Sequence, residues 1–117
     1  MSKIEKRSDI LFSVYLDDEK FPQKIEWHAT DSSAEKPQEC KAVMLSIWDS
    51  KLDEALRIDL WTKEMHQDEM DRFFFQTFIL MADTYHNANN NEALSKRIKD
   101  FAMQFGEATE VIKRKSE

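Results

Sequence analysis

The sequence predicts an α+β domain in which a four-stranded antiparallel sheet is followed by two helices packed on one of its faces, a two-layer ββββαα arrangement. The prediction depends on a change of apolar period: two residues across 9–62, as in strands, and three to four residues across 67–88 and 91–113, as in helices. No internal repeat or second core interrupts the 117 residues, so we expect a single domain over 1–117, with 1–8 flexible.

An antiparallel hairpin is predicted at the start of the sheet. Residues 9–16 and 24–29 each alternate between apolar and polar side chains, and the acidic turn at Asp17-Asp18 separates them. The polar residues 30–39 then form a surface loop. The predicted core face of the hairpin carries Ile10, Phe12, Val14, Leu16, Ile25, Trp27 and Ala29.

The second half of the sheet contains an ambiguous segment. Residues 41–48 are apolar on both faces, which fits a buried strand and also a buried helix over 38–48. We favour the strand because 49–54 has the composition of a hairpin loop and 56–61 alternate cleanly afterwards. The helical alternative remains open.

Two helices are predicted after the sheet. Asp68 and Glu69 lie in the first turn of the helix over 67–88, where the helix dipole favours negative charge. This helix is apolar on more than one face, so we expect it to be covered on two sides. Asn91 is a suitable N-cap for the second helix, and Gly106 within that helix indicates close packing against a neighbour.

One face of the predicted sheet has no cover, because two helices can cover only the other. The third strand would add an apolar set to this face, and large apolar patches are rare on monomers. We therefore expect the protein to form a homo-oligomer or to bind a partner here, unless 41–48 is a helix buried inside the monomer. The candidate interaction surface comprises Tyr15, Val43, Leu45, Ile47 and Trp61.

Composition and charge exclude several classes of protein. The chain has 23 acidic and 17 basic residues, a net charge of −6, and its only dense basic run is Lys113-Arg114-Lys115, so we expect no nucleic-acid partner. A single glycine excludes glycine-rich phosphate loops, and a single cysteine, Cys40, excludes a disulfide framework. No apolar run approaches the roughly 20 residues that span a bilayer. No signal peptide is recognisable, so we expect a cytoplasmic protein without membrane insertion.

Candidate ligands and nucleophiles are sparse. His66 and Glu69 are three residues apart at a helix start, as are Asp83 and His86 at a helix end, but neither pair has a third ligand. Cys40 adjoins an apolar run and is typical of a small core residue. We therefore predict no metal, no cofactor and no enzymatic activity. The alternative is a small-molecule or metal-binding domain with a pocket between helix and sheet. That pocket would be lined by Trp27, Phe74, Phe78 and His66.

Several strings go beyond what any generic fold requires. The string LRIDLWTKEM over 56–65 is followed by DEM over 68–70 and FFFQT over 73–77. The remaining strings are Lys24-Ile25-Glu26-Trp27, Met81-Ala82-Asp83-Thr84-Tyr85 and Phe105-Gly106-Glu107. From about residue 8 to 112, the chain resembles the gliding motility-associated protein GldC family.

The resemblance implies a small cytoplasmic accessory protein of the gliding machinery, without enzymatic activity or cofactor and with no catalytic residues to carry over. The strand order also resembles that of the export chaperone SecB, a likeness of topology only. The leading hypothesis is a non-enzymatic accessory protein of bacterial gliding motility that interacts with other proteins of the gliding or secretion machinery. The alternatives are the ligand- or metal-binding domain and a SecB-like export chaperone.

Overall fold

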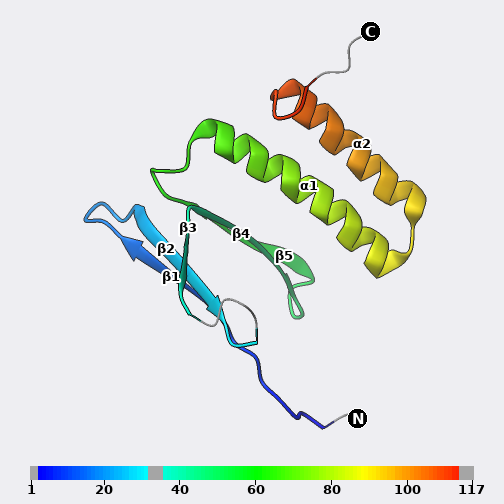
Figure 1. The fold of residues 1–117 in the computed structure, drawn as a ribbon. Coiled ribbons are helices and arrows are strands. Elements are labelled where there is room, and N and C mark those ends of the chain that lie inside the picture. Colours follow the sequence, from blue (N-terminus) through cyan, green and yellow to red (C-terminus); the bar gives the residue numbers. More distant parts are fainter. Residues whose placement is uncertain (1–2, 32–35, 114–117) are drawn as a thin grey trace. The chain divides into compact units, whose positions relative to one another are not determined.

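The computed structural model describes residues 3–31 and 36–113 and contains five strands and two helices (Figure 1). It divides into two compact units, Met1–Met65 with the strands and His66–Glu117 with the helices. The antiparallel sheets and the helices confirm the α+β class. The packing of the helices on a sheet face stays a prediction, as does the single domain. Two predicted segments extend beyond the described residues. These are the flexible start, at residues 1–2, and the basic run, at residues 114–115.

The first sheet is antiparallel and has β2 at its centre. Its strands, in spatial order, are β1 (Ile10–Leu16), β2 (Pro22–Ala29) and β3 (Gln38–Cys40). The register places Phe12 opposite Trp27 and Val14 opposite Ile25, which confirms the predicted alternation of this hairpin. Ile25 is completely buried because it lies on the central strand, between β1 and β3.

The second sheet is a single antiparallel hairpin. Its strands are β4 (Ala42–Asp49) and β5 (Glu54–Trp61). The pairing runs without interruption from Ala42 opposite Trp61 to Asp49 opposite Glu54. The strand prediction for 41–48 is therefore confirmed, and the helical alternative over 38–48 is wrong.

One aspartate organises the turn of each hairpin. Asp17 Oδ1 accepts the backbone N–H groups of Glu19 and Phe21, each at 2.9 Å, and Asp49 Oδ1 accepts that of Leu52 at 2.7 Å. In this position a carboxylate accepts hydrogen bonds from backbone N–H groups that have no partner in the strand pairing because they lie in the turn. The hydrogen bond from Phe21 N–H is the main reason that the pKa of Asp17 lies below its ordinary value.

The prediction of one four-stranded sheet is wrong, because an unpredicted strand, β3, precedes Lys41, and the predicted third strand belongs to a second sheet that begins after Lys41. Before this residue β3 pairs with β2, and after it β4 pairs with β5 (Figure 1). The Lys41 carbonyl accepts the Thr62 backbone N–H at 2.9 Å and lies 3.4 Å from the Thr62 hydroxyl. A strand that bends can leave one sheet and enter another. The predicted loop over 30–39 is correspondingly too long, since its last two residues belong to β3.

The helices form an antiparallel hairpin with a tight connection. α1 spans Gln67–Asn89 and α2 spans Glu92–Ala108. Asn90 ends α1 in the left-handed region with φ of 51°, and Asn91 caps α2 by accepting the Leu94 N–H at 3.1 Å, as predicted. The second helix ends at Ala108 rather than at 113, because the chain turns through Glu110 with φ of 63°. Within the described residues, no helix has the length and apolar character that crossing a membrane demands.

Small residues bring the two helices close together. The fully or nearly fully buried residues of the helices are Ala82, Ser95, Ala102 and Gly106. The Ser95 hydroxyl donates to the Ala82 carbonyl at 2.7 Å, which links the helices directly. Beside this contact the rings of Phe74, Phe78, Phe101 and Phe105 form a cluster with centroid separations of 5.3 to 6.4 Å. Such separations are typical of favourable aromatic pairs.

We expect Gly106→Val to lower the free energy of unfolding by about 1–3 kcal/mol, the usual cost of overpacking. A Cβ at this position would lie 2.7 Å from Phe75 Cε1 and 3.0 Å from Ile112 Cγ1. Chemical denaturation of the purified protein measures the change. The control is Gln104→Val, an exposed position of the same helix. Because valine has a higher helix propensity than glycine, propensity alone would stabilise Gly106→Val, so an unchanged or raised free energy of unfolding in this variant would contradict the close packing.

Candidate interaction surface

The β4–β5 hairpin has one face that is aliphatic at three successive opposite pairs and ends at the turn in the charged pair Asp49–Glu54. Residues opposite each other in an antiparallel pair project to the same face, and the face changes at each successive residue. We define the aliphatic face as Val43, Leu45, Ile47, Leu56, Ile58 and Leu60, which form three opposite pairs. Ile47, Leu56 and Ile58 keep 47%, 43% and 48% of their surface exposed. The period-two pattern predicted the β4 members of this face, and the register adds those of β5.

The other face of this hairpin is polar at its middle. Arg57 Nη2 and Asp59 Oδ1 form an ion pair at 2.8 Å, and the Arg57 guanidinium also donates to the Ser46 hydroxyl. The hydrogen bond to Asp59 raises the pKa of Arg57. Trp61 lies on this face, opposite Ala42, and is 56% exposed. The structure thus separates Trp61 from the aliphatic face, with which the predicted surface had grouped it.

Tyr15 also lies apart from the aliphatic face. It belongs to β1 in the other sheet, opposite Lys24. Its hydroxyl donates to Glu26 Oε1 at 2.8 Å, and the Lys24 ammonium lies 5.6 Å from its ring centroid. The hydrogen bond to the Glu26 carboxylate raises the pKa of Tyr15, because the bond favours the protonated phenol. Tyr15 therefore has polar neighbours, and the alternation of β2 already placed Lys24 and Glu26 on its face.

β1 is more exposed to solvent than its alternating pattern predicts. Alternation predicted a core role for Ile10 and Leu16, but they are 68% and 55% exposed. Leu11 and Tyr15, on the opposite face of the strand, are each half exposed. Both faces of β1 are accordingly open to solvent along much of its length. No sequence signal distinguishes this strand from one whose apolar face is covered.

The candidate metal ligands have other roles in the structure. The His66 backbone N–H donates to Glu69 Oε1 at 3.1 Å, which is a capping interaction at the start of α1. Asp83 forms an ion pair with Lys99 at 2.9 Å. His28 lies on β2 opposite Leu11. In the described ranges, His, Cys, Asp and Glu side chains nowhere gather in a group of three that could hold a metal ion.

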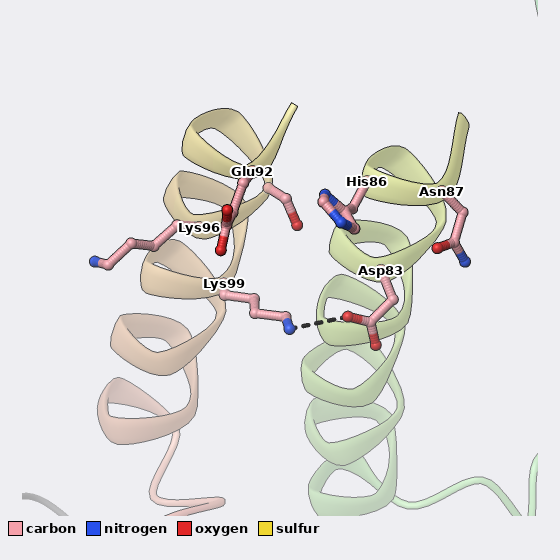
Figure 2. Close-up of a pocket in the computed structure, with 7 residues that line it drawn as sticks. Asp83, His86, Asn87, Glu92, Lys96 and Lys99 are labelled. Carbon is pink, nitrogen blue, oxygen red and sulfur yellow. Dashed lines mark ion pairs between the residues drawn. The ribbon is translucent and has the colours of Figure 1, made fainter. Parts of the chain in front are cut away.

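A polar cleft lies where α1 meets α2, with a volume of about 570 Å³ (Figure 2). Its lining residues are Asp83, His86, Asn87, Glu92, Ser95, Lys96 and Lys99. Lys99 reaches across to Asp83, and Lys96 pairs with Asp100 at 2.9 Å. The Nδ1 atom of His86 is buried without a hydrogen-bond partner. Both lysines that line the cleft therefore already have a carboxylate partner.

Cys40 is half-buried at the end of β3, opposite Ile25. Burial is the main reason that the pKa of this thiol is raised, and the negative charge of Glu39 acts in the same direction. A raised pKa lowers the fraction of the nucleophilic thiolate. This environment is typical of a structural cysteine.

The fold and its surface define a small α+β protein with an exposed hydrophobic sheet face. Residues 22–111 match the model of a family described as gliding motility-associated protein GldC-like. The match covers more than half of the chain, so the protein belongs to the GldC-like family, as its strings predicted. No curated protein and no solved structure matches the chain.

We expect iodoacetamide to alkylate Cys40 several-fold more slowly in the native protein than in the same protein unfolded in urea, at one mildly alkaline pH. Unfolding removes the burial that raises the pKa of the thiol and so increases the thiolate fraction. Mass spectrometry of timed samples measures both rates, with glutathione in the same urea as the control for the reagent. A native rate equal to or above the unfolded rate would contradict the assignment of Cys40 as an inactive thiol.

Proposed function

We propose that this GldC-like protein is a non-enzymatic accessory component of bacterial gliding motility that acts in the cytoplasm by binding other proteins. The observation that supports this proposal is the aliphatic face of the β4–β5 hairpin. It is continuous over three opposite pairs, from Val43–Leu60 to Ile47–Leu56, and half exposed at Ile47, Leu56 and Ile58. Apolar patches of this kind on a soluble protein are typical of interaction sites.

The distribution of charge within the hairpin supports a binding role for this face. Arg57 and Asp59, at the middle of the hairpin, lie on the opposite face, and the charged pair on the aliphatic side, Asp49 and Glu54, lies at its turn end. The centre of a protein–protein interface is depleted of charged residues, while charges lie at its rim. The aliphatic face has the composition of such a centre. A rigid two-stranded ladder also holds its side chains in place before binding, which lowers the entropy lost on association.

The proposed partners of the aliphatic face are proteins of the gliding or secretion machinery, and we propose separately that the chain forms a homo-oligomer. The net charge of −6 opposes binding to nucleic acid, whose phosphates would be repelled. We propose no direct insertion into the membrane. Membrane components of the machinery would instead be bound through segments that reach the cytoplasm.

Ile47→Glu should remove most of the partner bound by the tagged protein, because it places an uncompensated charge within the exposed part of the aliphatic face. Ala55→Glu is the matched control, since it adds the same charge to the opposite face of the same hairpin, where Ala55 is exposed. Affinity purification at native expression, followed by quantitative mass spectrometry, measures the bound proteins. Circular dichroism establishes that both variants keep the native fold.

Two outcomes would contradict the proposal. If Ile47→Glu is folded and retains the same partners as the unaltered protein, the aliphatic face is not the binding site. If the bound material is instead a broad set of unfolded export substrates, the export chaperone is the better description. Recovery of gliding or secretion components that Ile47→Glu loses and Ala55→Glu keeps would support the accessory role.

A further inference from the structure

β1 is an edge strand with an unprotected edge. The first sheet has the order β1-β2-β3, so β1 pairs with β2 on one side. Among the residues that the structure describes, no strand pairs with its other side. The backbone N–H and C=O groups on that side point away from the sheet, and such an edge is a template for pairing with another strand.

The sequence of β1 carries no charged or proline residue against edge pairing, and its one irregularity is a register shift at its end, between Tyr15 and Leu16. Its seven residues, ILFSVYL, include no charge, proline or glycine. Proteins generally place lysine, proline or a short strand at an exposed edge. The other strands at sheet edges differ: β3 has only three residues, β4 ends in Asp49, and β5 carries Arg57 and Asp59. The uncharged edge is therefore particular to β1.

We propose that β1 pairs antiparallel with β1 of a second copy of this chain, about a twofold axis at Ser13. The axis would stand perpendicular to the sheet, so that two three-stranded sheets join edge to edge into one. This inference is independent of the proposed function, because the aliphatic face lies on the other hairpin.

The strand is self-complementary in this register. Antiparallel pairing about Ser13 sets Ile10 opposite Leu16 and Phe12 opposite Val14 on one face, and Leu11 opposite Tyr15 on the other. Every opposite pair is then apolar or uncharged, and pairs of aromatic with aliphatic residues stabilise sheets. A twofold axis perpendicular to the sheet maps each face onto the same face of the partner. The face that carries Trp27 and Ile25 would thus continue across the axis.

Charges flank the paired segment at each end. In the same register Asp9 lies opposite the second copy's Asp17, just beyond the last paired residue. Both carboxylates already have cationic partners, because Arg7 lies 3.3 Å from Asp9 and Lys63 lies 3.5 Å from Asp17. The ends therefore oppose this register little, because both carboxylates are already compensated.

The variant Ser13→Lys tests whether two copies pair through β1 about a twofold axis at Ser13. Each lysine would lie directly opposite the lysine of the second copy, and like charges in that position oppose pairing. Within one copy the new cation would lie opposite Glu26 on β2, so the monomer fold has a reason to tolerate it. Sedimentation equilibrium should show a change from about twice 13.9 kDa for the unaltered protein to 13.9 kDa for the variant. Ser13→Glu should have the same effect on mass through repulsion between carboxylates.

An equimolar mixture of the two variants should recover the dimer mass, since lysine then lies opposite glutamate. Glu39→Lys is the control, because Glu39 lies opposite Glu26 on the other edge of the same sheet and should leave the dimer unchanged. Ile47→Glu should also remain dimeric, which separates this test from that of the proposed function. A monomeric unaltered protein at micromolar concentration would overturn the proposal. So would a dimeric Ser13→Lys, or a mixture of the folded variants that stays monomeric.

Discussion

The architecture of the strand unit depends on the bend at Lys41. Its carbonyl accepts the backbone N–H of Thr62, at the point where β3 ends and β4 begins. Thr62 is nearly fully buried, so this hydrogen bond is shielded from competing water. Because the bond extends the β4–β5 ladder to Lys41, the second hairpin is fixed at its open end. One continuous run of chain thereby belongs to two sheets.

That division explains why so little of the apolar content is buried. A single four-stranded sheet would give each inner strand two neighbours, whereas here only β2 has a strand on both sides. Ile25 on β2 is the one large side chain that the described residues bury completely. Several large side chains on strands with one neighbour retain half of their surface or more, namely Ile10, Leu11, Tyr15, Leu16, Trp48 and Trp61. The exposed apolar area is therefore a consequence of the topology, and covering it by association would offset the cost of exposing it to water.

Local signals in the sequence predicted the local structure well. The side chains of Asp17, Asp49 and Asn91 accept hydrogen bonds from backbone N–H groups. The sequence predicts a turn at Asp17, a hairpin loop from Asp49 and a helix N-cap at Asn91. Periodicity predicted the strands and helices because it depends only on which residues face a common side. The division at Lys41 was missed because nothing in residues 38–49 marks a bend. The end of α2 was missed because Ile112 continues the apolar pattern after the helix has ended.

For the candidate interaction surface, too, the sequence predicted what lies within one strand but not how two strands pair. Alternation groups Val43, Leu45 and Ile47 within one strand, and the structure keeps them together. Assigning Trp61 to their face needs the cross-strand register, which the length and geometry of the turn determine, and the register puts Trp61 on the other side. Pairing between strands is thus the property that one sequence specifies least directly.

The uncharged composition of β1 needs a physical reason, because burial does not supply one. Elsewhere the chain carries abundant charge, with 34% charged residues, yet Ile10–Leu16 has none although much of it is exposed. A single lysine at the edge would improve solubility and block pairing with other strands. Its absence leaves the edge able to pair, and the palindromic placement of apolar residues about Ser13 makes a second copy the natural partner. Association through β1 would then leave the β4–β5 hairpin available to a different protein.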